Sequence, residues 1–218
     1  YMQLKQDADG HDLDPADPDN WTVPTPIYRN DASLLNGNKQ LAATASGGVG
    51  MSLDMTYFQD ADGRSYYAWQ QLGATYIATM DPKDPAHVTS SPVRIVTPEY
   101  AWNAAIAEGP NVTLRDGKLY LMFSGSGVGK TYTTGLAVAD ASGTDLTDPA
   151  SWTVLNYPIQ KSGPFNGEMQ LGTGHGMWSE DEDGNQIYVF HAYATKNLGS
   201  VNAAGRDMFV RRVHWAAD

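Results

Sequence analysis

The feature that most limits the fold of this chain is a recurring Asp-Gly dipeptide, each copy of which precedes a short run rich in aromatic and β-branched residues. The dipeptides are Asp62-Gly63, Asp116-Gly117 and Asp183-Gly184, and the runs that follow begin at Tyr66, Tyr120 and Tyr188. Asp-Gly supplies the positive φ that a tight hairpin turn requires, so each copy predicts a β-hairpin. A short helical turn is expected only between Ser33 and Ala45. The chain is therefore predicted to be nearly all β.

The spacing of these turns indicates a repeat architecture. The turns are 54 and 67 residues apart, and a second marker, an Asp-Pro pair at Asp17, Asp81 and Asp148, recurs with steps of 64 and 67 residues. Repeats of this length fit four-stranded propeller blades better than solenoid repeats, which are shorter. The 218 residues would make three to four such blades, whereas propellers close with about four to eight. We therefore expect one β-propeller domain over residues 1–218, truncated at the N-terminus or at both ends, with Tyr1 to Leu4 forming an aromatic strand whose hairpin is missing.

Composition excludes several classes of function. The 14 Lys and Arg residues against 25 Asp and Glu residues give a formal net charge of −11, which argues against a nucleic-acid partner. No apolar run is long enough to span a membrane, and the absence of cysteine excludes disulfides and cysteine-based chemistry. The negative net charge does not argue against a neutral ligand such as a sugar. Neither the compartment nor the oligomeric state follows from the sequence.

Three ionisable residues share one position in the repeat. Asp54, Glu108 and His175 each lie eight residues before a turn aspartate. This position falls on the first strand of each blade, which faces the central channel of a propeller, so the three side chains are expected to converge. They could form a functional site, or they could be polar residues that line a wet channel.

Several segments resemble glycoside hydrolase family 43. Glu108-Gly109-Pro110 followed by the hairpin at Asp116 resembles the general-acid motif of that family, and Leu53 to Phe58 and Gly172 to Gly176 resemble its second-blade and fourth-blade motifs. The segment from Asp145 to Trp152 is similar to members that act on arabinose- and xylose-containing glycans. The resemblance extends from about residue 1 to Trp215, with Thr173 standing where the family usually has proline.

The resemblance implies a five-bladed β-propeller and an inverting glycosidase. Glu108 would be the general acid, and Asp54 would orient that acid and modulate its pKa. The general base of the family is a first-blade aspartate, which by the count of residues should lie about 11 residues before Tyr1, outside this chain. The isolated chain is therefore expected to be inactive.

The resemblance also suggests three substrate-binding residues. His175 would contact the sugar or a bound ion, which could be a structural calcium ion, and no cofactor is required. The alternative is a buried histidine held by backbone hydrogen bonds. Trp102 could stack on a sugar ring or be an ordinary packed aromatic residue. Arg206 would reach towards the sugar, or would form a surface salt bridge.

Two other motifs are excluded. Ser124 to Thr131 is close to a phosphate-binding loop, but serine replaces its first glycine and a strand-like run follows where a helix is required. The Asp-x-Asp-Gly segments that begin at Asp7, Asp60 and Asp181 are similar to calcium loops, but Gln71 stands where an EF-hand beginning at Asp60 needs glutamate, so they are interpreted as hairpin turns.

The sequence thus favours an enzyme that removes terminal arabinofuranosyl or xylosyl residues from an oligosaccharide or polysaccharide. A non-catalytic carbohydrate-binding propeller that lacks the base is the alternative, and a structural β-domain without a ligand is a third hypothesis.

Overall fold

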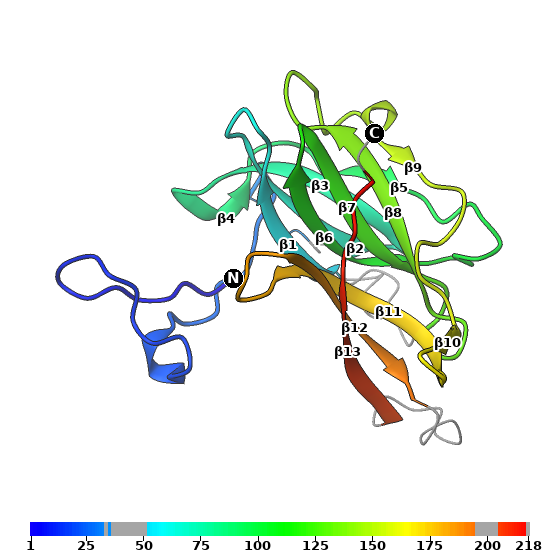
Figure 1. The fold of residues 1–218 in the computed structure, drawn as a ribbon. Helices are drawn as coiled ribbons and strands as arrows, with labels where there is room; N and C mark the ends of the chain where they lie inside the picture. Colours follow the sequence, from blue (N-terminus) through cyan, green and yellow to red (C-terminus); the bar gives the residue numbers. More distant parts are fainter. Residues whose placement is uncertain (33–34, 36–51, 195–204, 217–218) are drawn as a thin grey trace.

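The computed structural model describes residues 1–32, 35, 52–194 and 205–216, whose strands form three antiparallel sheets (Figure 1). The first sheet holds β1 (Ser52–Gln59), β2 (Ser65–Gln71), β3 (Ala74–Asp81), β4 (Asp84–Val88) and β5 (Val93–Val96). The second holds β6 (Ala107–Arg115), β7 (Lys118–Gly125), β8 (Thr133–Asp140) and β9 (Thr153–Val154). The third holds β10 (Gly163–Phe165), β11 (Glu168–Glu180), β12 (Gln186–Tyr193) and β13 (Arg206–Arg212). The short helical turn expected between Ser33 and Ala45 lies, apart from Leu35, outside the described residues.

Each sheet is a propeller blade. The strands follow one another as a meander, and Figure 1 shows the three sheets side by side, with the blue N-terminal segment projecting beyond the first of them. Two one-turn 3-10 helices, η1 (Pro18–Asn20) and η2 (Pro149–Ser151), interrupt the loops. No helix among the described residues is long and apolar enough to cross a membrane. The expectation of a nearly all-β chain with a few blades is confirmed.

The middle strands β2 and β7 are buried on both faces, because each face packs against a different neighbour. On β7, Leu119, Leu121 and Phe123 join the hydrophobic cluster shared with the first sheet. The intervening Met122 points the other way and packs with Tyr188 and other residues of the third sheet. Since successive side chains of a strand alternate between faces, β7 reads as a continuous apolar run rather than as an alternating one.

The predicted hairpin turns are present, but they are of two kinds. Asp116 and Gly117 form a two-residue turn in which both residues have positive φ, +47° and +75°. The loops Asp60–Arg64 and Asp181–Asn185 are longer, and in each the first carboxylate accepts hydrogen bonds from backbone N–H groups of its own loop. The aspartates of these Asp-x-Asp-Gly segments therefore stabilise turns, as expected.

The N-terminal segment corresponds to a different strand from the one expected. Leu4 forms an isolated bridge with Trp21, directly after η1, just as Val138 of β8 pairs with Thr153 directly after η2. The two 3-10 helices also share their capping: in each, an aspartate caps the start and the following tryptophan donates its indole N–H to a carbonyl oxygen six residues earlier. Tyr1 to Leu4 is therefore equivalent to the third strand of a blade.

This equivalence overturns one inference from the sequence. The position of the general base, about 11 residues before Tyr1, was counted on the assumption that Tyr1 to Leu4 is a second strand. A third strand is separated from the start of its blade by two strands, so the count is wrong. The first two Asp-Pro markers also differ in structure, because Asp17 caps η1 whereas Asp81 begins the turn between β3 and β4.

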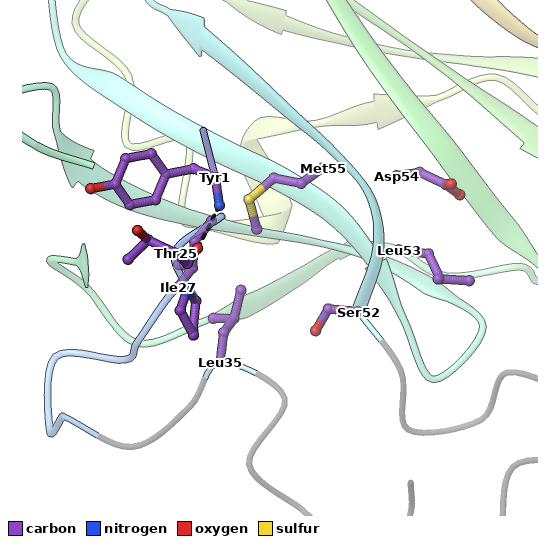
Figure 2. A pocket seen from close by; sticks show the side chains of 9 residues that line it. Tyr1, Thr25, Ile27, Leu35, Ser52, Leu53, Asp54 and Met55 are labelled. Atoms are coloured by element: carbon purple, nitrogen blue, oxygen red, sulfur yellow. Dashed lines mark hydrogen bonds between the residues drawn. The ribbon is translucent and has the colours of Figure 1, made fainter. Parts of the chain in front are cut away.

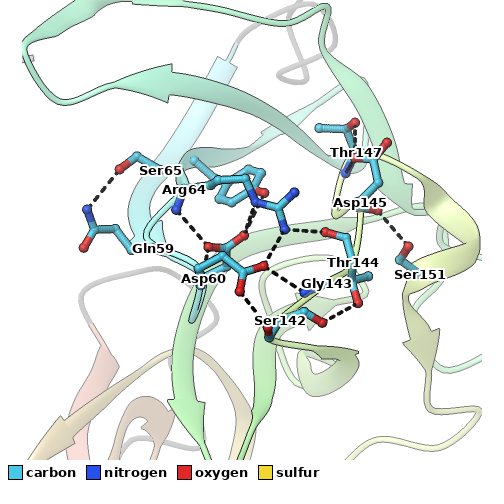
Figure 3. A network of polar contacts seen from close by, with 12 residues as sticks. Gln59, Asp60, Arg64, Ser65, Ser142, Gly143, Thr144, Asp145, Thr147 and Ser151 are labelled. Carbon is cyan, nitrogen blue, oxygen red and sulfur yellow. Dashed lines mark hydrogen bonds and ion pairs between the residues drawn. The ribbon is translucent and has the colours of Figure 1, made fainter.

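A polar network joins the first two blades (Figure 3). The Asp60 carboxylate, whose side chain is fully buried, accepts hydrogen bonds from Arg64 Nε at 2.7 Å and from the Tyr66 hydroxyl at 3.1 Å. Arg64 Nη2 then reaches the carbonyl oxygen of Thr144 in the loop after β8, and Asp62 accepts from Ser142 in the same loop. Burial, followed by the charge of Asp60, raises the pKa of Tyr66 to about 12. This hydroxyl is therefore protonated at neutral pH and donates to Asp60.

We expect Asp60→Ala to lower the free energy of unfolding by about 2–4 kcal/mol, because it leaves the Tyr66 hydroxyl and the Arg64 guanidinium without their acceptor. Chemical denaturation of the full-length protein measures this change. Asp84→Ala is the matched control, since Asp84 is exposed on β4, and it should cost less than about 0.5 kcal/mol. An Asp60 variant as stable as the Asp84 variant would contradict the structural role of the network.

Candidate active site

The three strands that carry the candidate residues, β1, β6 and β11, each have an irregularity at the site. Pairing shifts between Leu53 and Thr56 on β1, between Glu108 and Asn111 on β6, and again after Gly174 on β11. At each shift, one residue adopts a left-handed backbone: Asp54 with φ +58°, Gly109 with φ +59° and His175 with φ +50°. A β-bulge of this kind redirects side chains out of the pleat, which brings them together at the channel.

The bulges show that Glu108 is not at the same structural position as Asp54 and His175. The residue equivalent to these two is Gly109, so Glu108 lies one place earlier on its strand. The equal spacing of eight residues in the sequence is a coincidence of loop length, because β6 ends in a two-residue turn and β1 and β11 end in five-residue loops. The three side chains nevertheless converge, as predicted.

A chain of polar contacts joins them. The Tyr132 hydroxyl donates to Glu108 Oε1 at 2.5 Å and lies 3.1 Å from Nδ1 of His175. Nε2 of His175 is 3.5 Å from Asp54 Oδ1, and Asp54 Oδ2 accepts from the backbone N–H of Gly109 at 3.1 Å. Asp54 therefore anchors the backbone next to Glu108, and one connected cluster spans all three blades.

The cluster is accessible at one end and buried at the other. The His175 and Asp54 side chains are 43% and 22% exposed, whereas Tyr132 is completely buried. Burial, and then the negative charge of Glu108, raises the pKa of Tyr132. The phenol hydroxyl therefore keeps its proton, and solvent or a ligand can approach from the side of Asp54 and His175.

Arg206 also belongs to this region, through a histidine that the sequence analysis did not single out. Arg206 Nη1 lies 2.8 Å from Nε2 of His191, and since a guanidinium only donates, Nε2 is the acceptor. The His191 ring stacks on Tyr132, with ring centroids 5.6 Å apart, and on His175 at 6.3 Å. Burial, followed by the charges of Arg206 and His175, lowers the pKa of His191 to about 4. His191 is therefore neutral at physiological pH.

Trp102 is packed rather than free. Its indole stacks with Tyr100 and Phe123, and its N–H donates to the carbonyl oxygen of Asn156 at 3.1 Å. Among the described contacts, none joins Trp102 to Glu108, Asp54 or His175. Contact of Trp102 with a sugar stays a prediction, as does contact of His175 and Arg206 with one.

A cavity of about 520 Å³ reaches Asp54 from the N-terminal side. Figure 2 shows Tyr1, Thr25 and Ile27 on one side of it and Leu53, Asp54 and Met55 of β1 on the other. Its lining is largely apolar, with Asp54 as its charged group and the amino terminus of Tyr1 bonded to the Thr25 carbonyl oxygen. Figure 2 shows the Asp54 side chain turned away from Tyr1, Thr25 and Ile27, so the carboxylate lies at the edge of the cavity rather than inside it.

His175 and Asp54 supply two candidate ligand atoms for a metal ion, and both face other protein groups. Within the described part of the chain, three or more candidate ligand side chains gather only at Asp7, Asp9 and His11, where the Asp7 carboxylate accepts from the His11 backbone N–H and faces its ring. A structural calcium ion near His175 stays a prediction, and no step of a reaction is derived from it.

Fold and cluster together define a β-propeller with its ionisable residues on the strands β1, β6 and β11. The sequence model of "Glycosyl hydrolases family 43" matches residues 38–218, and the chain belongs to that family. Its sheets are blades of the all-β, five-bladed propeller of this family, as predicted.

The relatives are named as arabinofuranosidases. The chain is 32% identical over 180 residues to an "Extracellular exo-alpha-(1->5)-L-arabinofuranosidase" of Streptomyces avermitilis, covering 77% of this chain and 36% of that protein. It is 31% identical to "Alpha-L-arabinofuranosidase 43" of Humicola insolens, with the same shares covered. The chain thus spans about a third of the length of these curated relatives.

A solved structure confirms the fold over almost the whole chain. The crystal structure of an α-L-arabinofuranosidase from Lactobacillus brevis superposes with a TM-score of 0.74 at 25% identity, covering 98% of this chain and 66% of that one. A family 43 protein from Bacillus licheniformis, 22% identical, superposes with a TM-score of 0.64 over 94% of this chain and 33% of its own, which shows the shared fold.

We expect Arg206→Gln to raise the pKa of His191, because a nearby positive charge disfavours the imidazolium form. The pKa should stay below its ordinary value, since burial, the larger cause, remains. NMR titration of the imidazole protons measures both values, and Arg94→Gln, at an exposed position of β5, is the matched control. An unchanged His191 pKa in Arg206→Gln would rule out the contact.

The lowered pKa of His191 also makes stability depend on pH. At a pH between the unfolded pKa of about 6.5 and the folded pKa of about 4, His191 binds a proton in the unfolded chain but not in the folded protein. This contribution to stability is therefore complete above pH 6.5 and is lost as the pH falls towards 4. Denaturation midpoints of the wild-type protein and of His191→Gln, compared across this range, isolate the effect.

Proposed function

We propose that the protein is an inverting glycoside hydrolase that removes terminal arabinofuranosyl or xylosyl residues from oligosaccharides or polysaccharides. The observation that carries this proposal is the connected cluster in a family 43 propeller of Asp54 on β1, Glu108 on β6, His175 on β11 and Tyr132 directly before β8. The arabinofuranosidase names of the curated relatives favour arabinofuranosyl over xylosyl substrates.

The roles follow from what glycosidic cleavage requires. An inverting enzyme needs one carboxylic acid that protonates the leaving oxygen and one carboxylate that activates water, roughly 6.5–9.5 Å apart. Glu108 is the acid in this proposal. Asp54 orients Glu108 by accepting a hydrogen bond from the backbone N–H of Gly109, the next residue of the chain. The negative charge of Asp54 lies beside that N–H group.

The general base is proposed to lie upstream of this chain. Asp54, the other carboxylate of the described cluster, already accepts from Gly109 and faces His175, so it is poorly placed to activate water. We propose that the base lies on the first strand of the blade to which Tyr1 to Leu4 belong, and the equivalence of these residues with a third strand supports a position two strands earlier. The isolated chain should accordingly be inactive.

Glu108→Gln in the upstream-extended protein tests the proposal. Hydrolysis of 4-methoxyphenyl α-L-arabinofuranoside, whose leaving phenol needs protonation, should fall by about 10²–10⁴-fold. Hydrolysis of the 2,4-dinitrophenyl glycoside should change far less, because its phenolate leaves without a proton. The β-xylosides measured in parallel identify the sugar.

Glu99→Gln is the matched control, since Glu99 is exposed in the loop before β6 and should leave both rates unchanged. A folded wild-type protein that hydrolyses neither glycoside but binds arabino-oligosaccharides would replace this proposal with the carbohydrate-binding alternative.

A further inference from the structure

We propose that Tyr132 is a positioning residue for the general acid: one hydrogen bond from its hydroxyl holds Oε1 of Glu108, so that Oε2 carries the proton to the substrate. The inference deepens the function proposed above and rests on Glu108 being the acid. Tyr132 itself touches no substrate atom in this scheme.

The hydrogen bond has a defined direction. The Tyr132 hydroxyl is completely buried, and its raised pKa keeps it protonated, so it donates to Glu108 Oε1 whether the glutamate is ionised or neutral. Because Oε1 accepts this hydrogen bond, Oε2 is the oxygen that carries the proton of the neutral carboxyl group. The acid can therefore lose its proton to a leaving group and regain one without losing its orientation.

The position of the hydroxyl is fixed by the packing of its ring. A Cβ atom placed on Gly174 would lie 2.4 Å from Cδ1 of Tyr132, so the ring rests directly on the backbone of β11. A second contact is the stack with His191, the cross-strand partner of Gly174, with the two ring planes 12° apart. Because the ring packs against both β11 and β12, it has little freedom to move, and the hydroxyl keeps its position beside Glu108.

His175 completes the arrangement. Tyr132 has one proton and gives it to Glu108, so its oxygen can accept from Nδ1–H of His175 at 3.1 Å. The tyrosine thus receives one hydrogen bond and donates one. Such chains polarise their members and favour short, ordered contacts in a buried setting.

A glutamate without this contact would sample several rotamers. The side chain of Glu108 is half-buried, and misplacement of a reacting group by about 1 Å can cost about 10²-fold in rate. The effect should appear only where proton donation matters, because Tyr132 acts through Glu108 and not on the sugar.

Tyr132→Phe in the upstream-extended protein tests this inference, since it removes the hydroxyl and keeps the ring on Gly174 and His191. We expect kcat on the 4-methoxyphenyl glycoside to fall by about 10- to 100-fold with little change in KM. On the 2,4-dinitrophenyl glycoside, the rate should stay within about threefold of the wild type, because no acid is needed.

Tyr188→Phe is the matched control. Tyr188 is also buried, and its hydroxyl bonds Thr134 Oγ1 at 2.5 Å without touching Glu108. Tyr132→Phe loses the hydrogen bonds to Glu108 and His175, and Tyr188→Phe loses the one to Thr134, so each variant should lose about 1–2 kcal/mol of stability. Only Tyr132→Phe should show a dependence on the leaving group.

Gly174→Ala provides a second variant, which displaces the ring and keeps the hydroxyl, and it should show the same dependence. Equal losses on both glycosides in Tyr132→Phe, or behaviour identical to Tyr188→Phe, would overturn the inference while leaving the role of Glu108 intact. If Glu108→Gln itself shows no leaving-group dependence, the proposed function fails instead.

Discussion

The site depends on a left-handed backbone conformation that recurs on each of three strands. A left-handed conformation costs roughly 1–2 kcal/mol for a residue other than glycine, and the chain adopts it at Asp54 and His175. Only the surrounding pairing can hold such residues in place, and each of them lies within a strand that is paired on both sides of its bulge. The third position is a glycine, Gly109, where an added Cβ would also lie 3.3 Å from the His175 ring. The glycine both relieves the strain and lets the β6 backbone approach the imidazole.

Local chemistry explains what could be predicted from the sequence. Asp-Gly turns and aromatic runs act over a few residues, so the hairpins and the repeat could be found without knowledge of packing. The position of Glu108 relative to Asp54 was off by one, because turn length cannot be read from the turn aspartate alone. The assignment of Tyr1 to Leu4 as a second strand was wrong for a similar reason: an isolated aromatic run does not reveal which strand of a blade it is.

The partners within the site could not be predicted, because they come from distant parts of the chain. Tyr132 precedes β8 and meets Glu108 24 residues earlier and His175 43 residues later. In the sequence it follows a glycine-rich segment and has no distinguishing pattern. His191 sits in an ordinary aromatic strand, and only the pairing of β12 with β13 shows that Arg206 is its neighbour.

The site exists only where the three blades keep their relative positions, and this ties stability to function. The cluster draws Asp54 from one blade, Glu108 and Tyr132 from the next, and His175 from the third, so any relative movement of the blades would break it. The Asp60 network and the two-sided burial of β7 oppose such movement away from the channel. At the channel, the geometry depends on one hydroxyl proton. Because the Tyr132 hydroxyl can donate only once, its bond to Glu108 leaves its oxygen to accept from Nδ1–H of His175, and one tyrosine thereby ties side chains of two neighbouring blades together.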